Sequence, residues 1–243
     1  MENITPYKES ADDKKKQVAD MFNNIAWRYD FLNHFFSLNI DKYWRRKAIA
    51  NLRNQNIKSV LDIATGTGDL AIEVYKQISP DKIVGIDISD GMLAVGKEKL
   101  KKMNLDQYIT LKTGDSENIQ FPTASFDAVT VAFGVRNFAH LTVGLSEILR
   151  VLRPGGKLVI LEFSKPSVFP VKQFYTLYSK YILPLIGKIV SKDKAAYTYL
   201  PESVKAFPDG SKLTDIMREV GFTDVSYNIL TFGIVSVYIG SKK

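Results

Sequence analysis

The chain has 243 residues, of which 45% are hydrophobic and 24% are charged, as in an ordinary globular protein. The absence of cysteine excludes disulfides, thiolate zinc sites and a cysteine nucleophile, and the two histidines, His34 and His140, argue against a histidine-rich metal site. No apolar run approaches the roughly 18 residues that span a bilayer, and the polar N-terminus has no signal-peptide core. We therefore expect a cytoplasmic protein without a bound metal.

The formal net charge of +7 has three explanations: nucleic-acid binding, attraction to an anionic membrane surface, or plain solubility. The lysines are scattered, apart from the run at 14–16 and the pair at 101–102, and no interleaving of aromatic and basic residues typical of RNA binding occurs. We expect no nucleic-acid partner, and solvated surface charge is the simplest explanation.

The pattern of apolar residues predicts the secondary structure in chain order. The first 16 residues are polar and expected to be mobile, and helical spacing then predicts an N-terminal helical cap over residues 17–54. Short apolar runs predict strands, and amphipathic segments between them predict helices. The predicted strands are 59–64, 82–88, 109–112, 126–132, 157–163, 224–231 and 234–240, and the predicted helices are 69–78, 89–103, 141–152 and 213–220.

Strands that alternate with helices form βαβ units, so the order predicts a seven-stranded, mostly parallel α/β sheet with helices on both faces. Only a short turn separates the last two strands, so they pair antiparallel and place one reversed strand at or near an edge. The chain has no repeat and no sign of a second domain. We expect a single domain over residues 1–243, with a helical insert at 164–212.

The strongest chemical signal is the turn after the first predicted strand, where residues 61–68 read LDIATGTG. Gly66 and Gly68 permit positive φ and close backbone approach, at the edge of the sheet where α/β proteins bind ligands. The third glycine of the dinucleotide fingerprint is missing, because Asp69 and two apolar residues follow Gly68. This departure disfavours an NAD-dependent oxidoreductase.

Two acidic positions follow the glycine turn along the chain. Asp87 ends the second predicted strand, where a carboxylate can accept hydrogen bonds from both ribose hydroxyls, although it could also be a turn or N-cap acid. Asp115, in Gly114-Asp115-Ser116 after the third strand, can accept a hydrogen bond from an adenine amino group, with a simple Asx turn as its alternative. Together with the turn, these acids predict a nucleoside site.

The segments Asp62–Leu70 and Arg150–Phe163 (RVLRPGGKLVILEF), together with Asp87, resemble the Rossmann-like class I S-adenosylmethionine-dependent methyltransferases. The resemblance covers roughly residues 55–243, agrees with the antiparallel closing pair, and implies S-adenosylmethionine as the cofactor. Within this class, many members of one related family have serine where this chain has Ala132, so a side-chain contact is lost there while the backbone remains. The cofactor-binding residues that the resemblance implies are Asp62, Gly66, Thr67, Gly68, Asp87, Asp115, Ser116, Ala132 and Phe133.

Two further motifs, MFNNIAWRYDFLN at 21–33 and VAFGVRNF at 131–138, are similar to the ubiquinone/menaquinone biosynthesis C-methyltransferase family. This likeness spans residues 18–243 and implies methylation of a ring carbon of a prenylated quinol. Demethylmenaquinol is the favoured acceptor, and the ubiquinone precursor 2-methoxy-6-polyprenyl-benzoquinol is the alternative. Another small-molecule or RNA methyltransferase, and a non-catalytic cofactor-binding module, remain open.

Arg136 and Asn137 stand in an apolar stretch, where an arginine is costly to bury unless it is paired. Its role is therefore either a structural ion pair or the stabilisation of a quinol oxyanion, with Asn137 as a second donor. A guanidinium stays protonated and is a poor general base. For the ring proton we favour Asp69 or a water, with Tyr29 as a positioning or relay group and His34 as a weaker base.

The insert at 164–212 contains an apolar, aromatic stretch over 169–190 that includes Lys172, Lys180 and Lys188. A helical layer over the sheet and a homodimer face are the structural explanations. The functional explanation is a groove for a prenyl tail or a peripheral contact with the inner face of the membrane.

Overall fold

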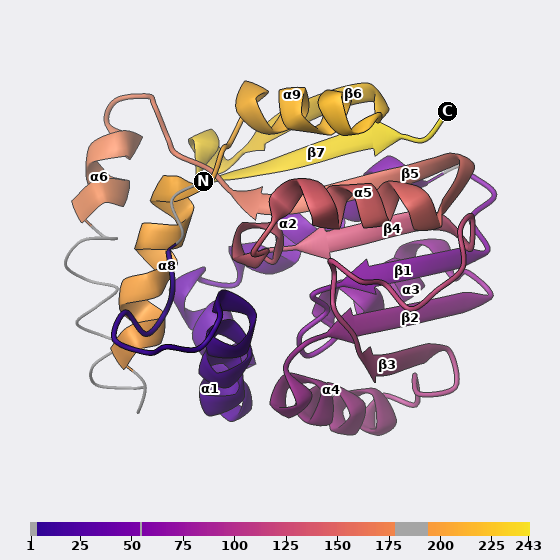
Figure 1. Ribbon diagram of the computed structural model, residues 1–243, viewed down its shortest axis with the longest axis horizontal. Helices are drawn as coiled ribbons and strands as arrows, with labels where there is room; N and C mark the ends of the chain where they lie inside the picture. The colour runs from indigo at the N-terminus through magenta and orange to yellow at the C-terminus, as the bar shows by residue number, and fades with distance from the viewer. Residues whose placement is uncertain (1–3, 54, 178–193) are drawn as a thin grey trace.

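The computed structural model describes residues 4–53, 55–177 and 194–243 (Figure 1). Within these residues seven strands form one sheet in the order β3-β2-β1-β4-β5-β7-β6. β1 to β5 pair in parallel, and β7 runs antiparallel to both of its neighbours. This confirms the predicted sheet, with its reversed strand beside the edge. The strands are β1 (Ser59–Ile63), β2 (Lys82–Asp87), β3 (Ile109–Thr113), β4 (Phe126–Ala132), β5 (Leu152–Phe163), β6 (Thr223–Leu230) and β7 (Val235–Ser241).

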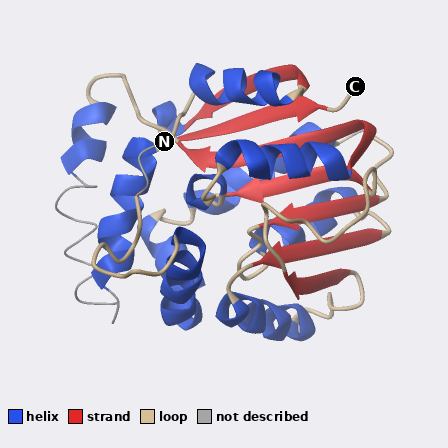
Figure 2. Cartoon of the chain, viewed as in Figure 1, coloured by secondary structure: helices blue, strands red, loops and turns tan. Residues whose placement is uncertain are grey.

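Helices cover both faces of the sheet, as Figure 2 shows. Successive side chains of a strand point to opposite faces. Val60 of β1 therefore packs in the core beneath α2, α3 and α4, whereas Leu61 and Ile63 pack beneath α5 and α9. The covering helices are α2 (Ile40–Ile49), α3 (Asp69–Ile78), α4 (Asp90–Lys102), α5 (Leu141–Val151) and α9 (Ser211–Val220).

Most predicted elements lie within one or two residues of the observed ones, but β5 begins five residues earlier than predicted. The Arg153-Pro154-Gly155-Gly156 segment, which lies between the predicted helix 141–152 and the predicted strand 157–163, belongs to the strand and passes through Gly155 at φ 77°. Gly155 also donates its N–H to the carbonyl of Lys242, which pulls this segment onto the C-terminal end of β7. A glycine can extend a strand through a conformation that other residues avoid.

The predicted helical cap over 17–54 is two α-helices rather than one. α1 (Lys14–Phe36) begins three residues early, because the Asp13 side chain accepts the N–H of Lys16 and caps the helix. The chain then breaks at Leu38 and Asn39, both at positive φ, before α2 starts. A short 3-10 turn, Ala50–Leu52, follows α2. Residues 4–13 are packed instead of extending freely, since Ile4 and Tyr7 contact the core of α1.

A third core lies between α1 and α8 (Lys194–Ala206), where Val18, Met21 and Leu32 pack against Ala196 and Tyr199. Together with α6 (Val171–Leu177), these helices gather beyond the carboxyl ends of the parallel strands (Figure 1). The described parts of the 164–212 insert thus contain two helices beside the N-terminal cap. Lys180 and Lys188 lie outside the described residues. Among the residues that the structure describes, no helix is both long and apolar enough to cross a membrane.

Candidate active site

A cleft opens at the carboxyl ends of β1, β2 and β4, between the glycine turn and α1. Asp87, at the end of β2, is buried and accepts the N–H of Gly66 at 2.8 Å and that of Ser89 at 2.9 Å. Burial raises the pKa of this carboxyl, and the two N–H donors oppose the rise. Asp87 therefore shapes the turn, which is the alternative role that the sequence offered. It also lines the cleft, where the ribose is expected.

The backbone around the cleft adopts conformations that most residues avoid. Ala64 and Phe133 have φ of 51° and 56°, and both line the cleft. Such strained residues concentrate at binding sites, where the surrounding fold holds them. Gly66 has φ 56°, and a Cβ there would lie 3.1 Å from the end of Met92, another lining residue. Glycine thus keeps this wall open, and a carboxylate beside exposed backbone suits a nucleoside.

Most of the predicted cofactor residues line the cleft, but three take positions behind it. Asp62 is buried in β1, accepts hydroxyl hydrogens from Thr65 and Thr130 at 2.6 Å, and has its pKa raised by burial to about 6. Thr67 donates its hydroxyl to Asp30 of α1 at 2.5 Å. Gly68, at φ 84°, is the N-cap residue directly before α3. The lining residues among those predicted are Gly66, Asp87, Asp115, Ser116, Ala132 and Phe133.

Asp115 accepts the N–H of Glu117 at 2.8 Å, which is the Asx turn that we considered as its alternative role. Its second oxygen lies 2.6 Å from the ammonium of Lys15, which also lies 3.0 Å from Glu117. Lys15 belongs to α1, so this ion pair closes one end of the cleft with the N-terminal helix. The contact joins residues 100 positions apart, and no local pattern indicated it.

A second cavity, of about 390 Å³, lies between α1, α2, α6 and α8. Its walls are mainly aliphatic and aromatic, with side chains such as Leu32, Trp44 and Leu200. It shares Phe22, Tyr29 and Phe133 with the cleft, so the two spaces adjoin. Burial raises the pKa of Tyr29, which lies at this junction. An apolar chamber beside a polar cleft suits a reaction between a polar and a greasy molecule.

Arg136 lies in a short 3-10 turn, Val135–Asn137, after β4, and it lines the second cavity with only 7% of its surface exposed. Its Nη1 lies 2.8 Å from Oε1 of the fully buried Glu162 and also donates to the carbonyl of Phe133. The structural ion pair that we considered is therefore present. However, the buried Nε of Arg136 has no hydrogen-bond partner within the described part of the chain. A buried donor left unpaired is costly unless a ligand accepts from it.

Asn137, the second predicted donor, faces the cleft and accepts the hydroxyl of Tyr199 at 3.1 Å. Burial raises the pKa of Tyr199 to about 12, so this tyrosine remains a hydrogen-bond donor at neutral pH. Neither Glu162 nor Tyr199 was predicted from the sequence as a site residue. The only local signal for Glu162 was an acid at the end of an apolar strand.

Asp69, our predicted proton acceptor, lies in an ion-pair network outside both cavities. Its carboxylate is 2.7 Å from Lys99, 3.3 Å from Arg45 and 3.9 Å from His34. Although burial opposes the effect, Arg45 and Lys99 hold the pKa of Asp69 below its usual value. A carboxylate with a lowered pKa and three cationic or hydrogen-bonding neighbours is a weak base.

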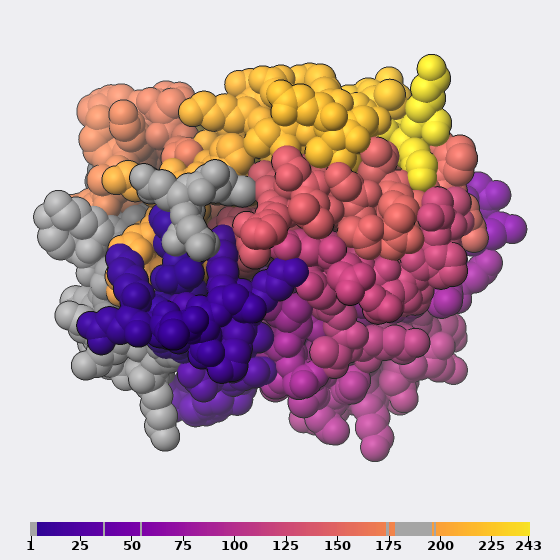
Figure 3. Space-filling view, in the orientation of Figure 1, coloured from indigo at the N-terminus to yellow at the C-terminus, as the bar shows by residue number. Residues whose placement is uncertain are grey.

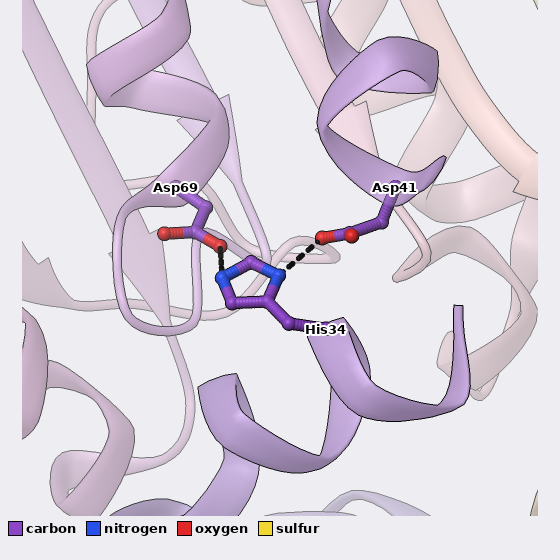
Figure 4. Close-up of side chains that lie close together, drawn as sticks. All are labelled: His34, Asp41 and Asp69. Carbon is purple, nitrogen blue, oxygen red and sulfur yellow. Dashed lines mark hydrogen bonds and ion pairs between the residues drawn. The ribbon is translucent and has the colours of Figure 1, made fainter. Parts of the chain in front are cut away.

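His34 lies between two carboxylates, as Figure 4 shows, with Nδ1 2.7 Å from Asp41 and Nε2 3.9 Å from Asp69. One ligand atom from each of these residues lies within 4.8 Å of the others, a spacing that a metal ion could use. Arg45 instead reaches both acids, at 2.5 Å from Asp41 and 3.3 Å from Asp69. The arginine supplies the balancing charge, and the cluster joins α1, α2 and α3.

The fold is that of the class I methyltransferases. A methyltransferase of Thermotoga maritima has the same fold, with a TM-score of 0.66 and 17% identity over 93% of this chain and 100% of that one. Phosphoethanolamine N-methyltransferase 2 of Haemonchus contortus has a TM-score of 0.59 and 17% identity over 88% of this chain and 59% of its own. At this identity the likeness shows the fold alone.

The sequence profile of the ubiE/COQ5 methyltransferase family matches residues 9–242, and the chain belongs to this family. The demethylmenaquinone methyltransferase of Bacteroides fragilis is 49% identical over 99% of this chain and 98% of its own length. That of Porphyromonas gingivalis is 46% identical over the same shares. The ubiquinone/menaquinone biosynthesis C-methyltransferase of Geobacter sulfurreducens is 45% identical over 98% of this chain and 93% of its own.

Proposed function

We propose that this enzyme transfers a methyl group from S-adenosylmethionine to a ring carbon of demethylmenaquinol. Two relatives with 49% and 46% identity carry the name of that activity. The observation that carries the proposal is the apolar cavity of about 390 Å³, which adjoins the cleft and has an arginine with an unpaired, buried N–H in its wall. A prenylated quinol has both the greasy body and the ionisable oxygen that this cavity fits.

The cleft residues fit the cofactor by their chemistry. Asp87 would accept the ribose hydroxyls, Asp115 and Ser116 would flank the adenine, and the backbone at Ala132 and Phe133 would contact the remainder. Asp62 and Gly68 act from behind by holding the turn. When bound, the cofactor supplies an electrophilic methyl group on a sulfonium.

Arg136 would stabilise the ionised quinol. A phenol has a pKa of about 10, so its ionisation at pH 7 costs about 4 kcal/mol. An adjacent cation lowers such a pKa by about 1–3 units and offsets much of that cost. Nη1 of Arg136 is engaged by Glu162, whereas the buried Nε–H has no partner among the described residues, and we propose that the quinol oxygen accepts from it. Asn137 lines the adjoining cleft, and its side-chain amide would be the second donor to the quinol oxygen.

After transfer, the methylated ring carbon still carries a proton, and its loss restores the aromatic ring. Because the ring regains its aromaticity when the proton leaves, this proton is acidic, and a weak base such as water suffices. Tyr29, at the junction of the two spaces, is placed to position the ring or relay the proton. Asp69 faces neither cavity, and we therefore favour water over this carboxylate.

The experiment is methylation of a short-chain, water-soluble demethylmenaquinol by the purified protein and S-adenosylmethionine, with the product identified by mass spectrometry. The reduced quinol should gain one methyl on the ring, and the quinone form should not react. Arg136→Ala should lose activity, whereas Arg153→Ala should keep it, since Arg153 pairs with Asp127 outside both cavities. No methylation of the quinol by wild type would refute the proposal.

A benzoquinol precursor of ubiquinone is the second acceptor to assay, because the relative with 45% identity carries both pathways in its name. The ratio of kcat/KM for the two acceptors decides between them. Mass spectrometry of the quinones from cells that lack this protein identifies the acceptor in vivo, because the unmethylated form of the true acceptor accumulates there.

A further inference from the structure

The corner formed by α1 and α2 exposes an unusual set of side chains. Between residues 27 and 47, every described side chain that is largely exposed is apolar, aromatic or basic, apart from one asparagine. Trp27, Phe31 and Leu38 are 64%, 65% and 80% exposed. We call this surface the α1–α2 face, and it comprises Trp27, Phe31, Phe35, Leu38, Asn39, Ile40, Lys42, Tyr43, Arg46 and Lys47.

The aromatic part of the face follows from helical spacing. Trp27, Phe31 and Phe35 are four residues apart and share one side of α1, where the rings of Phe31 and Phe35 stack at 6.0 Å. A neighbouring side of α1 already packs against α8 through Met21 and Leu32. α1 is therefore apolar on a second side that no core formed by the described residues buries. In Figure 3 the indigo N-terminal segment lies at the molecular surface. A contiguous apolar surface of this kind marks an interaction site.

The charge of the face has one sign. Its cations, Lys42, Arg46 and Lys47, form no ion pair within the described residues, and Lys47 lies 5.7 Å from the ring centre of Tyr43. The two acids of the same segment are neutralised, because Asp41 pairs with Arg45 and Asp30 with Lys99. A surface of aromatic and basic side chains without free acids complements an anionic lipid surface.

The face also continues into the apolar cavity. Leu38 and Ile40 are exposed on the face and line the cavity at the same time. An apolar chain could therefore pass from a bilayer beneath the face into the cavity without crossing water. We infer that the α1–α2 face docks on an anionic phospholipid bilayer, from which the prenyl tail of the acceptor enters the cavity. This inference rests on the proposed function for its acceptor, but not for the docking itself.

The test uses the full-length protein and sedimentation with vesicles of phosphatidylcholine, with and without phosphatidylglycerol. Trp27→Ser with Phe31→Ser should lower the vesicle partition coefficient by about tenfold or more, because the variant loses two aromatic side chains that would be buried in the bilayer. Lys42→Glu with Lys47→Glu should cause a loss of about tenfold on anionic vesicles and little change on neutral ones.

Matched controls lie elsewhere on the molecule. Ile229→Ser removes an apolar side chain that is 60% exposed on β6, and Lys58→Glu with Lys82→Glu reverses two exposed charges near the amino ends of β1 and β2. Neither control should change vesicle binding. Phe169→Ser, with 77% of the side chain exposed before α6, tests the membrane contact that is one explanation of the 164–212 insert.

Activity on the short-chain quinol without vesicles should be equal in wild type and in all these variants, and matching melting temperatures verify their fold. If the wild-type protein does not methylate the quinol, the proposed function is refuted, but the vesicle-binding result still stands. Equal vesicle binding by the Trp27/Phe31 variant and wild type would overturn the inference. So would loss of binding with Phe169→Ser alone, or a stable dimer in sedimentation velocity that the Trp27/Phe31 variant dissociates while its vesicle binding persists.

Discussion

Glu162 holds Arg136 from two directions: Oε1 lies 2.8 Å from the guanidinium Nη1, and Oε2 accepts the backbone N–H of Arg136 at 3.3 Å. Because Glu162 is fully buried, Glu162→Gln leaves the arginine charge uncompensated in the protein interior. Loss of one partner of a buried ion pair costs about 3–5 kcal/mol of stability. Urea unfolding should show this decrease in the free energy of unfolding. The variant should also lose kcat by a larger factor than its cofactor Kd changes.

The conservative variant Glu162→Asp keeps the charge and separates the effect on stability from the effect on kcat. If Glu162 positions the guanidinium, the aspartate should recover most of the stability but only part of kcat. Full recovery of both would reduce Glu162 to a charge-balancing residue.

Arg136 should set the pH dependence of turnover. In wild type, the rate should level off about 1–3 pH units below the phenol pKa of about 10, because the guanidinium stabilises the anion. In Arg136→Ala, kcat at pH 7 should fall by about 10- to 1000-fold and keep rising toward pH 10. Arg136→Lys keeps the charge but loses the planar fork, so an intermediate kcat is expected. A profile for the alanine variant parallel to that of wild type would exclude the anion role.

Asp87→Ala should weaken cofactor binding by about 10- to 100-fold, because the carboxylate would accept charge-assisted hydrogen bonds from the ribose. The variant also frees the N–H of Gly66, so the turn loosens as well. Asp87→Asn retains one acceptor and should lie between. Isothermal titration calorimetry with S-adenosylhomocysteine measures the effect, and an unchanged Kd is incompatible with the ribose role.

Asp62 should make folding stability depend on pH. Its pKa is raised by burial to about 6 from a usual value of 3.8, so between these pH values the folded protein holds a proton that the unfolded chain has released. The contribution of this group is therefore full below about pH 4 and lost as pH rises through about 6, a change of about 3 kcal/mol. Asp62→Asn has no such titration. Its stability relative to wild type should increase between pH 4.5 and pH 7.5 in urea unfolding, and a constant difference would contradict the shift.

Asp69→Asn distinguishes a proton acceptor from a network residue. Since Asp69 contacts Lys99 and Arg45 and faces neither cavity, we expect a lower melting temperature and a kcat within about tenfold of wild type. A loss of kcat by about 10³-fold or more, with normal stability, would restore Asp69 as the base that the sequence suggested.

The succession of strands along the chain, the glycine turn and the acid at the end of β2 were predictable, because each depends on local signals: apolar runs of strand length, a glycine pair and an acid at a strand end. The partners of Arg136 and Asp115 were not. Glu162 and Lys15 reach them from 26 and 100 residues away, and only the assembled sheet and cap bring them together.

The break between α1 and α2 also escaped prediction, since Leu38 has no preference for the left-handed φ that it adopts. Contacts in the surrounding structure hold it: Asp41 accepts the hydroxyl of Ser37 at 2.7 Å and contacts both His34 and Arg45. Tertiary contacts thus override local preference at this corner.

Phe22 and Tyr29 of α1 belong to the walls of both the cleft and the apolar cavity. We therefore expect the affinities for the two ligands to be interdependent, because whatever fixes these two side chains for one ligand lowers the entropic cost of binding the other. Thermodynamic reciprocity then requires that the quinol tighten the nucleoside by the same factor as the nucleoside tightens the quinol.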